Sequence, residues 1–121
     1  MTPKTGKVGF SRQSDPTLLI LTSLSSGPKH GHALIKDIEE ISGVRLGPGT
    51  LYGAITRLEE QNLIKPLNPV GRRQPYAITS SGIEVLKDTI ANLRMLAEVG
   101  SKRLGMIDKM GPALNTKLRV L

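Results

Sequence analysis

Hydrogen-bond donors that suit a polyanionic partner gather in two short segments of the chain. They are Thr50, Tyr52, Thr56 and Arg57 in a predicted helix, and Arg72 and Arg73 in a predicted loop. Hydroxyl and guanidinium groups can reach phosphate oxygens and the edges of nucleic-acid bases. The 17 Lys and Arg residues outnumber the 10 Asp and Glu residues, and the net charge of +7 adds a general attraction for polyanions. Net charge alone does not separate nucleic acid from acidic lipid.

Each of these residues also has a purely structural interpretation. Tyr52 can fill the shoulder of its helix, and Arg57 can pair with Glu60, an interaction worth a few tenths of a kcal/mol. Two adjacent arginines in a turn are often simply solvated. We favour nucleic-acid contact for Tyr52, because it lies at the edge of the polar face, and for Arg72 and Arg73, because they fall between two strands directly after the helix. For Arg57 both interpretations stay open.

No catalytic or metal-binding constellation is predicted. His30 and His32 lack a clear third ligand, and the sequence contains no cysteine. The glycines of residues 47–53 lack the GxxxxGK[ST] order of a phosphate-binding loop. Ser80 and Ser81 have no His and acid in a predictable relation, and Ser before a helix is usually a cap. We therefore predict no enzyme, no cofactor and no metal site.

Three helices are predicted in the first half of the chain. The first begins at Asp15, a good N-cap, with Pro16 in the first helical position. The second runs from about residue 30 to residue 42, and the third begins within residues 47–50. Apolar side chains of the third helix recur at i, i+4 and i+7, namely at Leu51, Ile55 and Leu58. This stripe must pack on the other helices, so the polar side of the third helix is left free.

A hairpin and a long fourth helix are predicted in the second half. Two short strands, near residues 63–67 and 76–78, flank a basic loop, while residues 44–46 can form only a very short extended segment. From residue 80 onwards, apolar side chains repeat at alternating steps of three and four. They are Ile83, Leu86, Ile90, Leu93 and Ala97. Such spacing is typical of a seam between two helices, so this helix is predicted to form a dimer.

The length of 121 residues allows one domain with an appended helix. Residues 1–14 are expected to form a flexible basic arm, and the structure of residues 109–121 is left undetermined. The longest strongly apolar run, residues 18–21, is too short to cross a membrane, and the N-terminus lacks the apolar stretch of a secretion signal. The absence of cysteine fits a reducing compartment. A cytoplasmic protein is therefore expected.

Three stretches of the sequence resemble PadR-type transcriptional regulators. Residues 47–52, continuing through 55–58 to 62–64, resemble their recognition helix, and residues 72–82 resemble their wing, second strand and the start of the dimerisation helix. Residues 30–35 resemble the start of their second helix. The resemblance covers about residues 16–105. It departs at His32, where the family usually carries Tyr, and the single helix after the wing, with few aromatic residues, resembles the shorter members.

The resemblance implies a winged helix-turn-helix, mainly α with a small β-hairpin wing (α+β), over residues 15–79, and a dimerisation helix over residues 80–108. It implies a homodimeric transcriptional regulator, commonly a repressor, whose partners are double-stranded DNA and its own second copy. Two-fold symmetry predicts an inverted-repeat operator. The alternative is a winged-helix module that binds a protein and no operator. A small-molecule effector is possible in this family, but an aromatic stacking pocket for flat drugs is not expected here.

Overall fold

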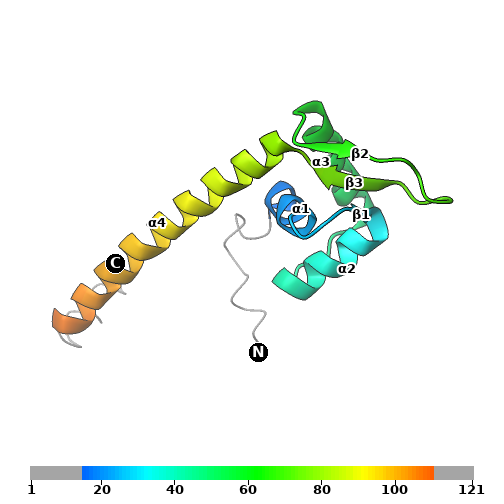
Figure 1. Ribbon diagram of the computed structural model, residues 1–121. Coiled ribbons are helices and arrows are strands. Elements are labelled where there is room, and N and C mark those ends of the chain that lie inside the picture. The colour runs from blue at the N-terminus through cyan, green and yellow to red at the C-terminus, as the bar shows by residue number, and fades with distance from the viewer. Residues whose placement is uncertain (1–14, 111–121) are drawn as a thin grey trace. The chain divides into compact units, whose positions relative to one another are not determined.

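The computed structural model describes residues 15–110 and divides the chain into two compact units, residues 1–86 and residues 87–121. The first unit contains, in chain order, α1 (Pro16–Leu24), β1 (Lys29–His30), α2 (Gly31–Ser42), α3 (Pro48–Glu60), β2 (Ile64–Pro66), β3 (Pro75–Ile78) and the start of α4 (Ser80–Met110) (Figure 1). The prediction of three helices, a hairpin and a long fourth helix is confirmed. The predicted arm, residues 1–14, and residues 111–121 lie outside the described residues.

Local caps set where the helices begin. The carboxylate of Asp15 accepts a hydrogen bond from the Thr17 amide at 3.0 Å, so it caps α1 as predicted. The Nδ1 atom of His30 accepts from the amide of Ala33 at 3.3 Å and caps α2. The Thr79 hydroxyl accepts from the Gly82 amide at 3.0 Å, directly before α4. These caps satisfy backbone N–H groups that have no partner inside the helix.

The core of the first unit forms where α1, α2 and α3 pack together. The largest buried apolar side chains are Ile20, Leu24, Leu34, Ile38, Leu51, Ile55 and Leu58. The predicted stripe of α3 is therefore fully buried, as the i, i+4, i+7 spacing required. Because this stripe is fixed in the core, the rotation of α3 about its own axis is also fixed, and its polar side faces solvent.

The sheet has three antiparallel strands in the order β1-β3-β2, so the predicted hairpin of β2 and β3 is present and a third strand that was not predicted joins it. The third strand is β1, in which Lys29 pairs with Tyr76 and His30 with Pro75. A strand of two residues is too short to show alternating apolar and polar side chains in the sequence. His30 is also the N-cap of α2, so residues 29–30 are interpreted from the sequence as the approach to that helix. The extended segment expected at residues 44–46 forms no strand; Leu46 is instead buried in the core.

The start of α4 belongs to the first unit and packs closely against Leu63, which precedes β2, and against Ile78 of β3. A Cβ atom at Gly82 would lie 2.7 Å from Cγ1 of Ile78 and closer still to the carbonyl oxygen of Leu63. Leu86 is buried in the same core, with 7% of its surface exposed. The remainder of α4 is one helix that continues through Gly100 and Gly105 and ends at Met110, two residues beyond the predicted bound.

The contact at Gly82 predicts an effect on stability. Gly82→Ala should lower the free energy of unfolding by about 1–3 kcal/mol, because the added methyl group meets backbone that cannot move aside. Gly105→Ala is the matched control: its Cβ atom meets nothing within 4 Å, and alanine favours the helix by up to about 1 kcal/mol. Urea unfolding of both variants measures the difference. A Gly82→Ala protein as stable as the wild type would contradict the prediction.

Candidate nucleic-acid interface

One side of α3 is exposed along its whole length. It carries Gly49, Thr50, Tyr52, Gly53, Thr56, Arg57 and Glu60, opposite the buried stripe. A Cβ atom on Gly49 would meet nothing within 4 Å, and one on Gly53 would meet only the Arg57 guanidinium, at 4.0 Å. The helix backbone is therefore open to close approach at these two positions, one turn apart.

The first turn of α3 adds backbone donors to this side. Gly47 is the N-cap and has no side chain to accept a hydrogen bond, and Pro48 occupies the first helical position. The amides of Gly49 and Thr50 therefore receive no side-chain cap from this residue, and both residues are exposed. The N-terminal end of a helix carries a partial positive charge. This end of α3 thus has the polarity that an anionic partner requires.

Thr56 and Arg57 use their polar groups differently. The Thr56 hydroxyl donates to the carbonyl oxygen of Tyr52 at 3.0 Å, so its hydrogen is engaged within the helix. Thr56 can then offer a partner an oxygen acceptor and a methyl group. Within residues 15–110 Arg57 forms no ion pair with Glu60; the salt bridges in that range join Lys29 to Asp37 and Arg45 to Glu39. The ion-pair interpretation of Arg57 is therefore not supported.

Tyr52 lies between α3 and the start of α2. Its side chain is 49% exposed, yet its phenol lies directly against Gly31, the first residue of α2. The structure therefore combines the two interpretations of this tyrosine, since one part of the ring packs on a neighbouring helix and another faces solvent. Gly31 is not among the predicted site residues, because nothing in the sequence around residue 31 indicates which residue of α3 it meets.

Tyr76 lies in β3 behind this region and is buried, with 9% of its surface exposed. Burial raises the pKa of its phenol above the usual value, and electrostatic repulsion from Glu59 and from Tyr52 raises the pKa further. A phenol is already neutral at physiological pH at its ordinary pKa, and the raised pKa moves its ionisation to still higher pH. Tyr76 therefore adds no charge to the buried region between β3 and α3.

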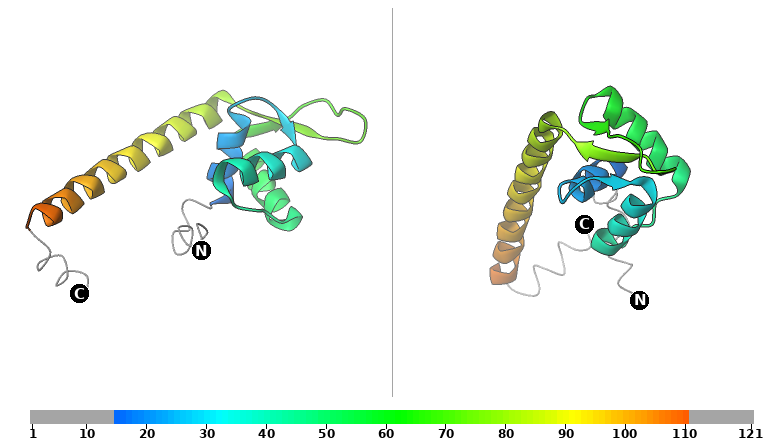
Figure 2. Two further views of the ribbon diagram at one scale, coloured as in Figure 1. Left: turned by 90° about the horizontal axis from the view of Figure 1, so that it is seen from below. Right: turned by 45° about the vertical axis from the view of Figure 1, so that its right-hand side comes forward.

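The tip of the β2–β3 hairpin is a tight turn. The amide of Val70 donates to the carbonyl of Arg73 at 2.9 Å, and the amide of Arg73 donates back at 3.0 Å. Gly71 and Arg72 are the two residues between, and Gly71 has a φ of 61°, which favours glycine. The loop projects beyond the sheet (Figure 2). Arg72 and Arg73 are both exposed at this tip, where the prediction placed them.

All the residues predicted to contact nucleic acid therefore lie in the first unit and are exposed, four on α3 and two at the turn. The structure places His30 at a helix cap rather than in a metal site. Within residues 15–110, no three His, Asp or Glu side chains group as metal ligands do. None of the helices described there is long and apolar enough to span a membrane.

The family follows from comparison with known proteins. Residues 20–88, more than half of the chain, match the family described as the transcriptional regulator PadR-like family. The chain belongs to this family. The match begins within α1 and ends in the first turns of α4, so it contains α2, α3 and the wing. The predicted family and the predicted winged helix-turn-helix fold are confirmed.

The chain is also similar to two proteins of bacterial origin. The PadR-like chain is 47% identical over 76 residues to an uncharacterised 37.1 kDa protein in transposon TN4556 of Streptomyces fradiae, covering 63% of the chain and 22% of that protein. It is 29% identical over 112 residues to the transcriptional regulator YqjI of Escherichia coli K12, covering 90% of the chain and 54% of YqjI. The chain thus spans at most about half the length of these two relatives.

The solved structures match the PadR-like chain over more of their own length. The PadR family transcription regulator of Clostridium difficile R20291 shares 28% identity with a TM-score of 0.67, over 74% of this chain and 97% of that one. A PadR family regulator of Eggerthella lenta shares 29% identity at the same TM-score of 0.67. Both results support the winged-helix fold and the long helix that follows it.

The predicted dimerisation residues divide into two groups. Leu86 is buried within its own protomer, so the structure removes it from the exposed seam. Ile83 and Ile90 are 41% and 37% exposed, Leu93 is half-buried and Ala97 is exposed. The spacing of these residues puts them on one side of α4, with Leu104 farther along the same side.

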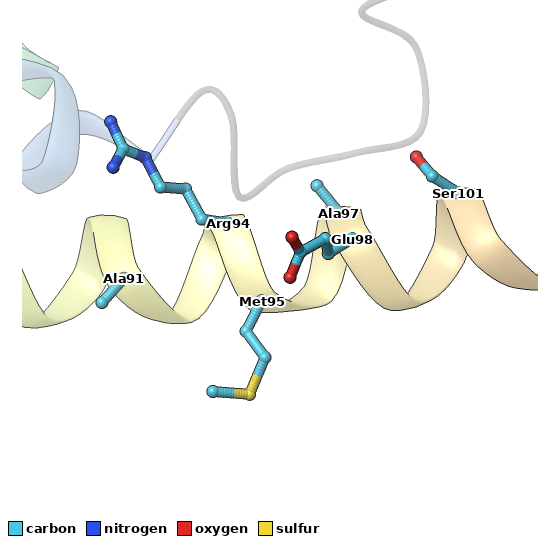
Figure 3. A pocket seen from close by; sticks show the side chains of 6 residues that line it. All are labelled: Ala91, Arg94, Met95, Ala97, Glu98 and Ser101. Carbon is cyan, nitrogen blue, oxygen red and sulfur yellow. The ribbon is translucent and has the colours of Figure 1, made fainter.

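Another set of α4 side chains lies around the opposite side. Figure 3 shows Met95 pointing away from the side on which Ala97, Arg94 and Ser101 project. Met95 is 63% exposed. The six residues labelled there all come from α4, so the hollow that they line is an open helix surface. The two sides of α4 can therefore be substituted separately, to test which of them forms a dimer interface.

Proposed function

We propose that this PadR-family protein is a sequence-specific DNA-binding regulator, that two copies bind an inverted-repeat operator as a homodimer, and that operator occupancy represses transcription. The observation that carries the proposal is the exposed side of α3, which presents hydroxyl, guanidinium and backbone donors while its other side is fixed in the core. Family membership and the net charge of +7 support it. A chromosomal partner implies a cytoplasmic location.

In this proposal α3 lies in the major groove and reads base edges. The Arg57 guanidinium suits the O6 and N7 acceptors of guanine. Thr56, whose hydroxyl hydrogen is engaged by Tyr52, suits a base amino group or the methyl group of thymine. Gly49 and Gly53 let the helix backbone come close to the floor of the groove, because no side chain stands between.

The wing has a different task. Arg72 and Arg73 stand at the tip of a two-residue turn, whose backbone is held by the paired hydrogen bonds of Val70 and Arg73. The Gln74 amide donates to the carbonyl oxygens of Leu67 and Pro75, at 2.7 Å and 2.9 Å, and holds the two strands together below the tip. A rigid cationic tip is suited to phosphate contacts, which contribute affinity without reading sequence.

Dimerisation rests on the apolar side of α4. Ile83, Ile90, Leu93 and Ala97 repeat at the spacing of a helix–helix seam, and three of them are exposed. An exposed stripe of this kind is stabilised when a second copy covers it. An isologous dimer relates its two α3 helices by a two-fold axis, which is why the operator is expected to be an inverted repeat.

Selection of bound fragments from a pool of random duplexes tests the proposal. The enriched sequences should contain an inverted repeat whose half-sites are about 34 Å apart, one turn of B-DNA, or a multiple of that distance. Asymmetric single half-sites should bind weakly. Enrichment of direct repeats would contradict the symmetric dimer, and a pool that shows no enrichment at all would contradict sequence-specific binding.

The alternative function is a winged-helix module that binds another protein through α3 and the wing. Titration of duplex DNA across a salt series separates the two functions. DNA affinity should fall steeply with salt, since each phosphate contact contributes a slope of about −0.9 in log affinity against log salt. A chain that shows no measurable DNA affinity at low salt would instead favour the protein-binding module.

A further inference from the structure

Gly31 stands at the point where three elements meet. It is the first residue of α2, it follows β1 directly, and it is buried. A Cβ atom on Gly31 would lie 2.8 Å from Cζ of Tyr52, 3.4 Å from its Cε1, and closer still to its hydroxyl oxygen. Atoms of folded proteins do not approach a Cβ so closely, so only glycine at this position leaves room for the Tyr52 ring.

The backbone around Gly31 is itself held in place. His30, just before it, pairs with Pro75 in the sheet and caps α2 through the amide of Ala33, 3.3 Å away. Lys29 pairs with Tyr76 of the same strand. The start of α2 is therefore fixed by the sheet on one side and by the cap on the other, and it cannot move aside to admit a methyl group.

Tyr52 is the only one of the two contacting residues that can move. It is 49% exposed and belongs to the outward side of α3. If the ring can no longer pack against Gly31, Tyr52 must adopt another staggered rotamer, which directs the ring elsewhere around α3. The ring then either crowds the side of α3 that carries Thr56 and Gly53 or leaves the position from which it could meet a partner.

We infer that Gly31 is a positioning residue for DNA recognition: it holds the Tyr52 ring in the one orientation in which α3 reads its operator. This inference rests on the proposed function. It assigns a role to a buried glycine of α2 that touches no DNA itself, and it makes the contact between Gly31 and Tyr52 a determinant of specificity rather than only of packing.

A double-mutant cycle tests the inference on the full chain. The variants are Gly31→Ala, Tyr52→Leu and the two combined, with a duplex selected by the wild-type protein and a scrambled duplex of the same composition as probes. Gly31→Ala should lower the selected-to-scrambled affinity ratio by about tenfold, within the range of one lost base contact. In the Tyr52→Leu background the same change should alter the ratio by less than about twofold, because no phenol is left to displace.

A spectroscopic measurement reports the ring directly. The sequence contains 2 Tyr residues, so the protein labelled with 3-fluorotyrosine gives two ¹⁹F signals. Gly31→Ala should shift the Tyr52 signal in the absence of DNA, with Tyr76 as the internal reference. Gly105→Ala, whose added methyl group meets nothing within 4 Å and which lies off the proposed dimerisation side of α4, is the control and should change neither the signal nor the affinity ratio.

The outcomes separate the inference from the function on which it rests. If the wild-type protein does not prefer its selected duplex, the proposed function fails. If the wild type discriminates and Gly31→Ala retains the full ratio, or lowers it equally in both backgrounds, the positioning role is wrong. If Gly31→Ala alone does not fold, the combined variant decides: it must fold, and its ratio must equal that of Tyr52→Leu.

Discussion

Glutamate at both Ile90 and Leu93 is expected to convert the proposed dimer into monomers and to weaken binding to the proposed operator by about 10²- to 10⁴-fold. Two negative charges on the apolar side of α4 cannot be buried against a second copy without a large desolvation penalty. The affinity falls because two half-sites joined in one dimer bind with an effective concentration that separate protomers lack. Light scattering at micromolar concentration measures the mass, and duplex titration measures the affinity.

The control places the same charges on the other side of α4. Met95 and Val99 are 63% and 40% exposed, and the helical spacing puts both away from the side that carries Ile90 and Leu93. Their double glutamate variant should remain a dimer and bind the operator as the wild type does. Leu86 is avoided, because it is buried within its own protomer and its substitution would destabilise the first unit. A dimer that survives glutamate at Ile90 and Leu93 would contradict the proposed seam.

Removal of the wing arginines is expected to weaken every duplex, whatever its sequence. A dimer carries Arg72 and Arg73 twice, so the Ala double variant loses about four phosphate contacts and its slope of log affinity against log salt flattens by about 3.6. Relative to 1 M salt, where these contacts contribute little, the slope change corresponds at 0.1 M salt to a loss of roughly 4 × 10³-fold in affinity for operator and random DNA alike. Titration of both duplexes over a salt series measures the salt slope for each duplex and the ratio of operator affinity to random-DNA affinity.

A charge-matched control separates wing contacts from net charge. Lys102 and Arg103 are exposed on α4, outside α3 and the wing, and their Ala double variant removes the same number of cations. It should leave the salt slope nearly unchanged. An unchanged slope for the wing variant, or a loss confined to the operator, would mean that Arg72 and Arg73 read bases rather than neutralise phosphates.

The sequence by itself determined the features that depend on near neighbours along the chain. The caps at Asp15 and Thr79, the buried stripe of α3 and the turn that exposes Arg72 and Arg73 all follow from residues a few positions apart. Helix periodicity then decided which side of α3 faces solvent. For this reason every residue predicted to contact DNA was found exposed and on the predicted element.

Only the tertiary structure decided the contacts between segments far apart in the chain. The strand β1, the burial of Leu86 in the first unit and the meeting of Gly31 with Tyr52 are of this kind. A strand of two residues shows no period, and a leucine on a regular helical stripe looks the same whether its own protomer or a second copy covers it. Likewise, the sequence around a glycine at the start of a helix does not reveal which distant aromatic ring occupies the space that a side chain there would fill. These features arise from packing in three dimensions, which periodicity and local propensity do not encode.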